Sequence, residues 1–192
     1  MTGFWSFQSP FDRKYGGPLH DRWPTFKIAL NWLHRTKGLV IVETGTLRRE
    51  DSMDGGSTIL FGDYCLTHEA RLFTVDVDAG HLELSKRRTQ EYAGVTTYVH
   101  GDSVEFLRGF TRPIHLLYLD SFDYDENDPA PAQRHALKEI EAALPKLTPR
   151  ACVLIDDNRR EGGGKGELVK GRLEAEGFAC LLDLFQSVWV RF

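Results

Sequence analysis

The stretch LVIVETGT at residues 39–46 decides the expected fold. Its first four residues are apolar, which predicts a strand buried on both faces, as at the centre of a parallel sheet. The strand is expected to end at Glu43, and the chain to turn at Gly45. Gly55-Gly56-Ser57 then offers a helix start, with Ser57 able to accept a hydrogen bond from a free backbone N–H. Strand, glycine turn and helix start together predict a ligand crevice in an open α/β sheet.

Alternating apolar runs and helical patterns continue along the chain. Further strands are expected at 72–77, 95–100, 114–120 and 152–155, and helices at 57–67, 79–92, 103–109, 131–147 and 167–176. This alternation predicts a parallel sheet with right-handed crossovers. The last two strands, 179–185 and 188–192, are only about two residues apart, so they must pair antiparallel. The fold class is therefore α/β, a doubly wound seven-stranded sheet with an antiparallel last strand.

The chain is expected to form one globular unit in two parts. Residues 1–37 comprise an aromatic arm and a leading helix, on which Trp23, Phe26, Leu30 and Leu33 share one face. Residues 38–192 make the α/β domain. The arm over residues 1–18 is broken by glycine and proline and shows no clear period. We expect it to pack on its own domain; a substrate lid or a homodimer contact are the alternatives.

Composition excludes several classes of protein. The 192 residues are 41% hydrophobic, which is enough for a sizeable core. Net charge is −4 and no basic run occurs, so general nucleic-acid binding is not expected. No apolar stretch reaches membrane-spanning length, and the first 20 residues lack the apolar core of a signal peptide. Three widely spaced cysteines predict buried free thiols in a reducing, cytoplasmic setting.

The glycine turn identifies a family resemblance. Gly45 is followed by Thr46-Leu47-Arg48-Arg49, so the three-glycine dinucleotide fingerprint is missing. An acid at the strand end followed by one glycine, as in Val42-Glu43-Thr44-Gly45-Thr46, resembles class I S-adenosylmethionine-dependent methyltransferases. The closing hairpin also matches that family's chain order. The resemblance implies a Rossmann-like methyltransferase fold that binds S-adenosylmethionine. A buried strand before an unrelated glycine turn is the alternative.

The same resemblance implies a set of cofactor-binding residues. Asp76, at the end of the second strand, would accept the ribose hydroxyls, and Asp102 with Ser103 would receive the adenine amino group. The expected set is Glu43, Thr44, Gly45, Thr46, Ser57, Asp76, Asp102, Ser103 and Asp120. For Asp76 and Asp102 the alternative role is that of a helix cap.

Acids also end the fourth and fifth strands. Asp120 follows one strand and Asp156-Asp157-Asn158 the next, and hard divalent cations prefer such oxygen ligands. The pattern resembles metal-dependent O-methyltransferases of the catechol and caffeoyl-coenzyme A type. That resemblance implies that Asp120, Asp157 and Asn158 hold Mg²⁺, with Mn²⁺ or Ca²⁺ as alternatives. Otherwise these acids only cap helices and solvate the edge of the sheet.

One departure from that family concerns proton transfer. Where those enzymes have a lysine three residues after the first ligand, this chain has Asp123. Asp123 and Asp120 are therefore the expected catalytic residues, with Asp123 as a base or an added ligand. The acid-rich segment is more similar to antibiotic-sugar O-methyltransferases. The expected reaction is metal-assisted methylation of a hydroxyl on a small molecule.

Two other residues are expected near the substrate. Lys165 lies in the glycine-rich loop 162–166, where it could grip an anion unless the loop is simply flexible. His135 lies near the start of a helix and is either a substrate contact or a structural residue. Two other functions stay open. Asp76-Val77-Asp78 also resembles the D-x-D motif of metal-dependent glycosyltransferases, and the fold could be a cofactor-binding module without catalysis.

Overall fold

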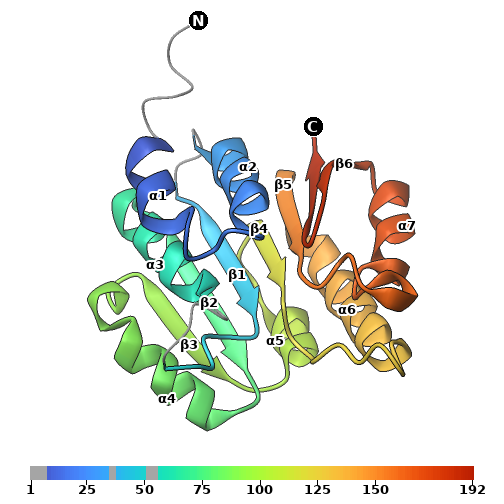
Figure 1. Ribbon diagram of the computed structural model, residues 1–192, viewed down its shortest axis with the longest axis horizontal. Coiled ribbons are helices and arrows are strands. Elements are labelled where there is room, and N and C mark those ends of the chain that lie inside the picture. The colour runs from blue at the N-terminus through green and yellow to red at the C-terminus, as the bar shows by residue number, and fades with distance from the viewer. Residues whose placement is uncertain (1–7, 35–37, 51–55) are drawn as a thin grey trace, which may run out of the picture.

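The computed structural model describes residues 8–34, 38–50 and 56–192, which form a seven-stranded sheet with helices on both faces (Figure 1). The strands follow the order β3-β2-β1-β4-β5-β7-β6. β1 to β5 run parallel, and β7 runs antiparallel to both of its neighbours. The bounds are β1 Val40–Thr44, β2 Arg71–Asp76, β3 Thr96–His100, β4 Ile114–Leu119, β5 Leu147–Ile155, β6 Phe178–Asp183 and β7 Ser187–Arg191. The predicted fold class is confirmed.

The helices alternate with the parallel strands. Their bounds are α1 Gln8–Tyr15, α2 Trp23–Leu33, α3 Ser57–Thr67, α4 Ala79–Arg88, α5 Ser103–Gly109, α6 Ala130–Ala143 and α7 Glu167–Ala175. Short 3-10 turns lie at Gln90–Tyr92, Leu144–Lys146 and Glu161–Gly163. Among the described helices, none is both long and apolar enough to cross a membrane.

Two hydrophobic clusters hold the layers together, one on each face of the sheet. Successive strand residues point to opposite faces, so Ile41 belongs to one cluster while Val40 and Val42 belong to the other. The first cluster joins the sheet to α1, α2 and α3, and the second joins it to α5, α6 and α7. This arrangement explains why the central strands read as unbroken apolar runs.

The leading segment contains a helix that the sequence did not predict. In α1, Phe11 and Tyr15 are four residues apart and their ring centroids lie 5.6 Å from each other. This i, i+4 pair is the helical signal within an otherwise irregular arm. Tyr15 and Trp23 belong to the same cluster as β1, so α1 and α2 pack directly on the sheet. The arm's first seven residues lie outside the described ones.

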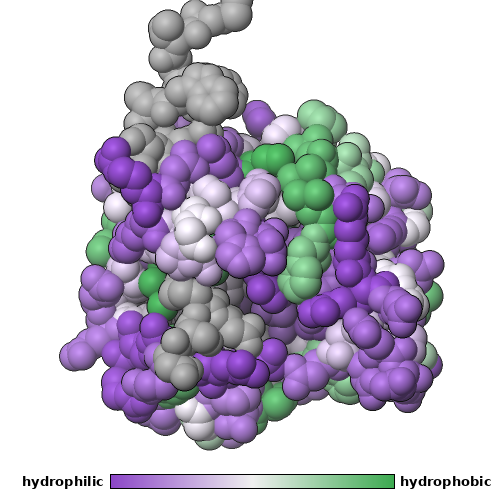
Figure 2. Space-filling view, in the orientation of Figure 1, coloured by the Kyte–Doolittle hydropathy of each residue, from purple (hydrophilic) through white to green (hydrophobic). Residues whose placement is uncertain are grey.

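The C-terminal hairpin forms one edge of the sheet. Residues 184–186 connect β6 to β7, which is one residue more than predicted. Figure 2 shows hydrophobic side chains gathered over this end of the molecule, while most of the visible face is hydrophilic. Cys180 lies on β6 and is exposed, unlike Cys65 and Cys152. The expectation of three buried thiols was therefore wrong for Cys180, because the edge strand is covered on fewer sides than a central one.

Candidate active site

A cleft of about 480 Å³ opens at the carboxyl ends of β1, β2 and β4. This is the edge at which open α/β sheets bind ligands. The cleft is lined by Gly45, Thr46, Arg48, Val75, Asp76, Val77, Asp78, His81, Gly101, Asp102, Ser103, Asp120, Ser121, Phe122, Asp123 and His135. Its volume lies within the range of roughly 300–1,000 Å³ that is usual for small-molecule sites.

The turn after β1 brings two strand ends together. Gly45 has φ +84°, and a Cβ atom there would lie 2.6 Å from the backbone oxygen of Asp120. Only glycine fits this close approach in the left-handed region. Behind the turn, the buried carboxylate of Glu43 accepts a hydrogen bond of 2.8 Å from the Thr58 hydroxyl. Burial raises the pKa of Glu43 to about 7, although nearby hydroxyl groups act to lower it.

Backbone N–H groups hold both Asp76 and Asp78. Asp76 accepts at Oδ1 from the N–H of Asp78 over 2.8 Å and at Oδ2 from the N–H of Thr46 over 3.3 Å. Asp78 is the N-cap of α4 and accepts from the N–H groups of Gly80 and His81. Asp78 therefore acts as a helix cap, whereas Asp76 connects the turn after β1 with the end of β2 at the cleft wall.

The third strand end leads to a polar chain on the cleft wall. Asp102 is exposed and caps α5 by accepting from the N–H of Glu105. Ser103 Oγ lies 3.0 Å from His135 Nε2, which lies 3.4 Å from a carboxylate oxygen of Glu139. Glu139 is buried and also accepts from the Ser121 hydroxyl over 2.6 Å. The hydrogen bond to Glu139 raises the pKa of His135 above its ordinary value, although burial opposes this rise.

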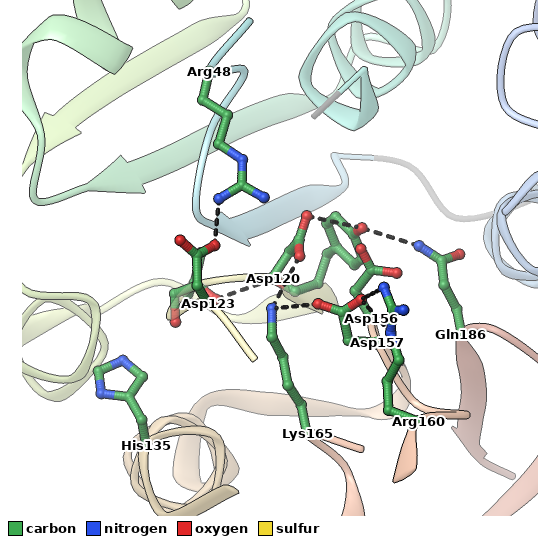
Figure 3. Close-up of polar contacts among 12 residues, drawn as sticks. Arg48, Asp120, Asp123, His135, Asp156, Asp157, Arg160, Lys165 and Gln186 are labelled. Carbon is green, nitrogen blue, oxygen red and sulfur yellow. Dashed lines mark hydrogen bonds and ion pairs between the residues drawn. The ribbon is translucent and has the colours of Figure 1, made fainter. Parts of the chain in front are cut away.

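Three carboxylates meet where β4 and β5 end. Ligand atoms of Asp120, Asp156 and Asp157 lie within 4.8 Å of one another. Lys165 lies between two of them, with Nζ 3.3 Å from Asp120 Oδ1 and 3.2 Å from Asp157 Oδ2 (Figure 3). The Lys165 side chain is only 4% exposed. Strand ends that are distant in sequence therefore share one buried ammonium group.

Two arginines complete the ion pairs of these carboxylates. Asp156 is fully buried and forms an ion pair with Arg22. Arg22 Nε donates to both carboxylate oxygens, over 3.1 Å to Oδ1 and 3.0 Å to Oδ2, and Arg22 Nη2 lies 3.0 Å from Oδ2. Arg160 Nη2 donates to Asp157 Oδ1 over 3.0 Å. The second oxygen of Asp120 accepts from the Tyr118 hydroxyl over 3.2 Å. All six carboxylate oxygens are thus engaged.

The ionisation of the cluster follows from these contacts. Burial and the neighbouring Asp156 hold the pKa of Asp120 well above its usual range, although Lys165 acts to lower it. Burial also opposes ionisation of Asp157, but Lys165 and Arg160 outweigh it and lower its pKa. Burial acts to lower the pKa of Lys165, and the carboxylates reverse that effect and raise it. Lys165 is therefore an ammonium group.

The comparisons with known proteins identify the family. A family model described as a methyltransferase domain matches residues 52–158, which is more than half of the chain. The chain belongs to this family. It is a methyltransferase domain, and the predicted resemblance to class I S-adenosylmethionine-dependent methyltransferases is confirmed. No curated protein matches the sequence.

Solved methyltransferase structures share the fold at low sequence identity. The O-methyltransferase NovP has a TM-score of 0.67 at 15% identity, over 89% of this chain and 79% of its own. The SAH-bound methyltransferase PaMTH1 from Podospora anserina has a TM-score of 0.66 at 15% identity, over 95% and 82%. The N-methyltransferase NodS from Bradyrhizobium japonicum WM9 has a TM-score of 0.60 at 14% identity, over 95% and 97%. The same fold therefore serves acceptors of more than one kind.

The predicted cofactor residues of the methyltransferase fall into two groups. Six line the cleft: Gly45, Thr46, Asp76, Asp102, Ser103 and Asp120. The other three lie behind it, since Glu43, Thr44 and Ser57 are buried. Ser57 does not act as the expected cap of α3, because the helix begins at Ser57 itself and its N-cap is Gly56. Gly55 lies outside the described residues.

Two other predicted residues, Asn158 and Asp123, have contacts outside the acid cluster, and Asn158 Oδ1 is buried without a hydrogen-bond partner among the described residues. Asn158 is buried and donates from Nδ2 to Asp183 and to the carbonyl of Leu184. Among His, Cys, Asp and Glu side chains, Asp156 is the third group that lies beside Asp120 and Asp157. Asp123 pairs with Arg48 at the surface, with its side chain 83% exposed (Figure 3). The hydrogen bond from Arg48 lowers the pKa of Asp123, which makes it a weak base.

The glycine-rich loop holds the Lys165 side chain against the acid cluster. Gly162, Gly163 and Gly164 all have positive φ. A Cβ atom on Gly164 would collide with the backbone of Asp157 and Asn158, so the loop folds tightly against the end of β5. The Lys165 side chain is consequently buried among carboxylates. The expected anion contact of Lys165 therefore has no support in the geometry.

Sequence reasoning missed several residues of the site. Arg22 reaches Asp156 across 134 positions in sequence. Gln186 donates to the Tyr118 hydroxyl over 3.0 Å, and Tyr118 in turn holds Asp120. These partners carry no motif, because only the fold brings them together. Glu139 had a local signal, since it lies four residues after His135 on the same helix face.

Proposed function

We propose that the methyltransferase transfers a methyl group from S-adenosylmethionine to a hydroxyl group of a small molecule. The observation that supports it best is the cleft itself, which runs from the ribose-binding position at Asp76 past Asp120 to Phe122 and His135. The first part would hold the cofactor and the second the acceptor. The similarity to the O-methyltransferase NovP favours oxygen as the accepting atom.

The cofactor would bind along the first three strand ends. Asp76 would accept the ribose hydroxyls, and the turn at Gly45 and Thr46 would contact the methionine end. Asp102 and Ser103 would lie beside the adenine. When bound, S-adenosylmethionine supplies an electrophilic methyl group on a sulfonium sulfur. The residues of the chain then have to orient an acceptor oxygen in line with that methyl and remove its proton.

His135 is the proton acceptor that the geometry favours. It lines the cleft, and Glu139 lies behind it in a buried position. A histidine oriented by a carboxylate is a common general base, because its pKa lies near neutral pH. The O–H bond of the acceptor would break as the new O–CH₃ bond forms, with the proton passing to His135. Asp123 is less suited to accept the proton, because its hydrogen bond from Arg48 lowers its pKa and so opposes protonation of the carboxylate.

The predicted magnesium ion is opposed by the charges that surround its site. Three carboxylates do converge, as such an ion would need. Three cations already neutralise them, namely Arg22, Arg160 and Lys165, and every carboxylate oxygen has a hydrogen-bond or ion-pair partner. A divalent cation would have to displace Lys165 from a buried position. No step of the proposed reaction therefore passes through a metal.

The two alternative functions have weaker support. The Asp76-Val77-Asp78 motif fits a glycosyltransferase poorly, since Asp78 is engaged in capping α4. A cofactor-binding module without catalysis would not need the His135–Glu139 pair beside the cleft. Neither alternative explains as many of the cleft residues as methyl transfer does.

Labelled methyl transfer tests the proposed function. The protein would be incubated with methyl-labelled S-adenosylmethionine and a small-molecule extract, and products would be analysed by mass spectrometry. We expect an O–CH₃ product, and about a hundredfold lower kcat in His135→Gln, within the usual range for a general base. Asp123→Asn is the matched control and should retain its kcat. Labelled amines would contradict oxygen as acceptor, and equal loss in both variants would contradict the role of His135.

A further inference from the structure

The Lys165 ammonium lies where a metal-dependent site would hold its cation. It contacts one carboxylate from each of two neighbouring strand ends, Asp120 after β4 and Asp157 after β5. The two Nζ–O distances, 3.3 Å and 3.2 Å, are nearly equal. A divalent cation would bridge the same oxygens.

Counted as ionised groups, the three carboxylates and three cations of the cluster balance without any added ion. The carboxylates of Asp120, Asp156 and Asp157 face the three cationic groups of Arg22, Arg160 and Lys165. Hard cations bind where several anionic oxygens are uncompensated. Removing Lys165 would leave one excess negative charge and free one oxygen on each of two carboxylates. The parent chain has neither this excess negative charge nor a carboxylate oxygen of the cluster without a partner.

The position of Lys165 is fixed by the fold. The loop before it packs against the end of β5, and the backbone N–H of Lys165 donates to the Asp157 carbonyl over 3.1 Å. Gln133 on α6 donates to the carbonyl oxygens of Gly162 and Gly164 over 2.7 Å and 3.2 Å. Tyr124 accepts from the N–H of Gly164 over 3.1 Å. These contacts place the ammonium group between the carboxylates before any ligand binds.

We infer that Lys165 replaces a divalent cation between the ends of β4 and β5, so that the protein needs no metal to keep this part of the site in order. Lys165 is a positioning residue: it fixes Asp120, which lines the cleft. The inference rests on the proposed function only in placing the acceptor beside Asp120. The charge replacement itself is a property of the folded chain.

Mn²⁺ titration followed by electron paramagnetic resonance tests this inference. Lys165→Met removes the ammonium and keeps an unbranched side chain of similar length. The matched control is Lys86→Met, which breaks the exposed pair between Lys86 and Glu83. We expect the parent and Lys86→Met to bind no Mn²⁺ below ~1 mM, and Lys165→Met to gain one site that is about tenfold tighter or more.

Two results would overturn the inference. One is a parent protein that binds a single Mn²⁺ ion below ~100 μM and loses that site in Asp120→Asn. The other is a folded Lys165→Met protein that binds S-adenosylhomocysteine but no more Mn²⁺ than the parent does. If Lys165→Met does not fold, the parent titration decides alone: no site supports the inference and a tight site overturns it. Because binding is measured, a failure to find a methyl acceptor would count only against the proposed function.

Discussion

The carboxylates at the two halves of the sheet edge have partners of different kinds. At the ends of β2 and β3, Asp76 and Asp102 accept hydrogen bonds from backbone N–H groups. Asp76 binds its own loop and the turn after β1, and Asp102 binds the first turn of α5. At the end of β5, Asp156 and Asp157 are bound by the cationic side chains of Arg22 and Arg160. Arg22 is distant in sequence, whereas Arg160 follows Asp157 by three residues. A neutral partner leaves a carboxylate able to accept further hydrogen bonds from a ligand. A cationic partner fixes it in a charge-balanced cluster.

The largest expected effect comes from removing a cation of the cluster. Arg22→Met leaves the fully buried Asp156 without its bidentate partner. An uncompensated buried charge typically costs about 3–5 kcal/mol of unfolding free energy. Urea denaturation of the parent and the variant measures it.

The control for this prediction is an ion pair at the surface. Arg172→Met breaks the exposed pair with Glu176 on α7 and should cost only about 0.3–0.5 kcal/mol. The double variant Arg22→Met/Asp156→Asn should recover part of the lost stability, because it removes the unpaired charge. Similar losses of unfolding free energy in Arg22→Met and Arg172→Met would mean that the buried ion pair contributes no more to stability than the exposed one, which would contradict the prediction.

A smaller, pH-dependent effect is expected at Glu43, whose described hydrogen-bond partner is a neutral hydroxyl. Burial raises its pKa to about 7 in the folded chain, above the ordinary value of an unfolded chain. The stability that the protonated Glu43 side chain contributes is therefore complete at low pH, and it is lost as the pH rises through about 7. Glu43→Gln does not titrate, so its stability relative to the parent should improve by roughly 2 kcal/mol between about pH 5 and pH 8.

Urea denaturation of both proteins at the two pH values measures this difference. Thr97→Ala, at an exposed position of β3, is a control that does not change a titrating group. Its stability difference from the parent should be the same at both pH values. A Glu43→Gln difference that does not change with pH would show that Glu43 is ionised at the lower pH too, and that the neutral hydroxyls suffice to hold the charge.

The smallest effect separates the two halves by ligand affinity. Asp76→Asn removes an anionic acceptor from the cofactor half of the cleft and should weaken S-adenosylhomocysteine binding about tenfold, or roughly 1.4 kcal/mol. Asp157→Asn changes the cluster half and should leave that affinity within about twofold, an effect below roughly 0.5 kcal/mol. Calorimetric titration of both variants measures it. Equal weakening would show that the cofactor contacts both halves.

The fold could be predicted from sequence because its signals are local. The apolar run before Glu43, the alternation of strands and helices, and the short final connection each lie within a few residues. The α1 helix was missed because its signal is a single aromatic pair, Phe11 and Tyr15. The start of β5 at Leu147 was missed because Pro149 interrupts the expected apolar pattern.

The site could be predicted only where its partners are neighbours in sequence. The cleft position of Asp76 follows from its place at the end of a strand. The ion pairs of the cluster do not follow in this way, since Arg22 comes from before α2 and Lys165 from after β5. Sequence placed acids at two adjacent strand ends and suggested a metal, because it gave no sign that cations would fold into the same space.

Calorimetric titration of the parent protein with S-adenosylhomocysteine tests most directly whether the cleft binds S-adenosylmethionine. We expect one molecule to bind per chain with Kd below ~100 μM, about −5.5 kcal/mol or stronger, and with the same affinity in the presence of a metal chelator. Absence of binding at protein and ligand concentrations well above ~100 μM would contradict the cofactor assignment.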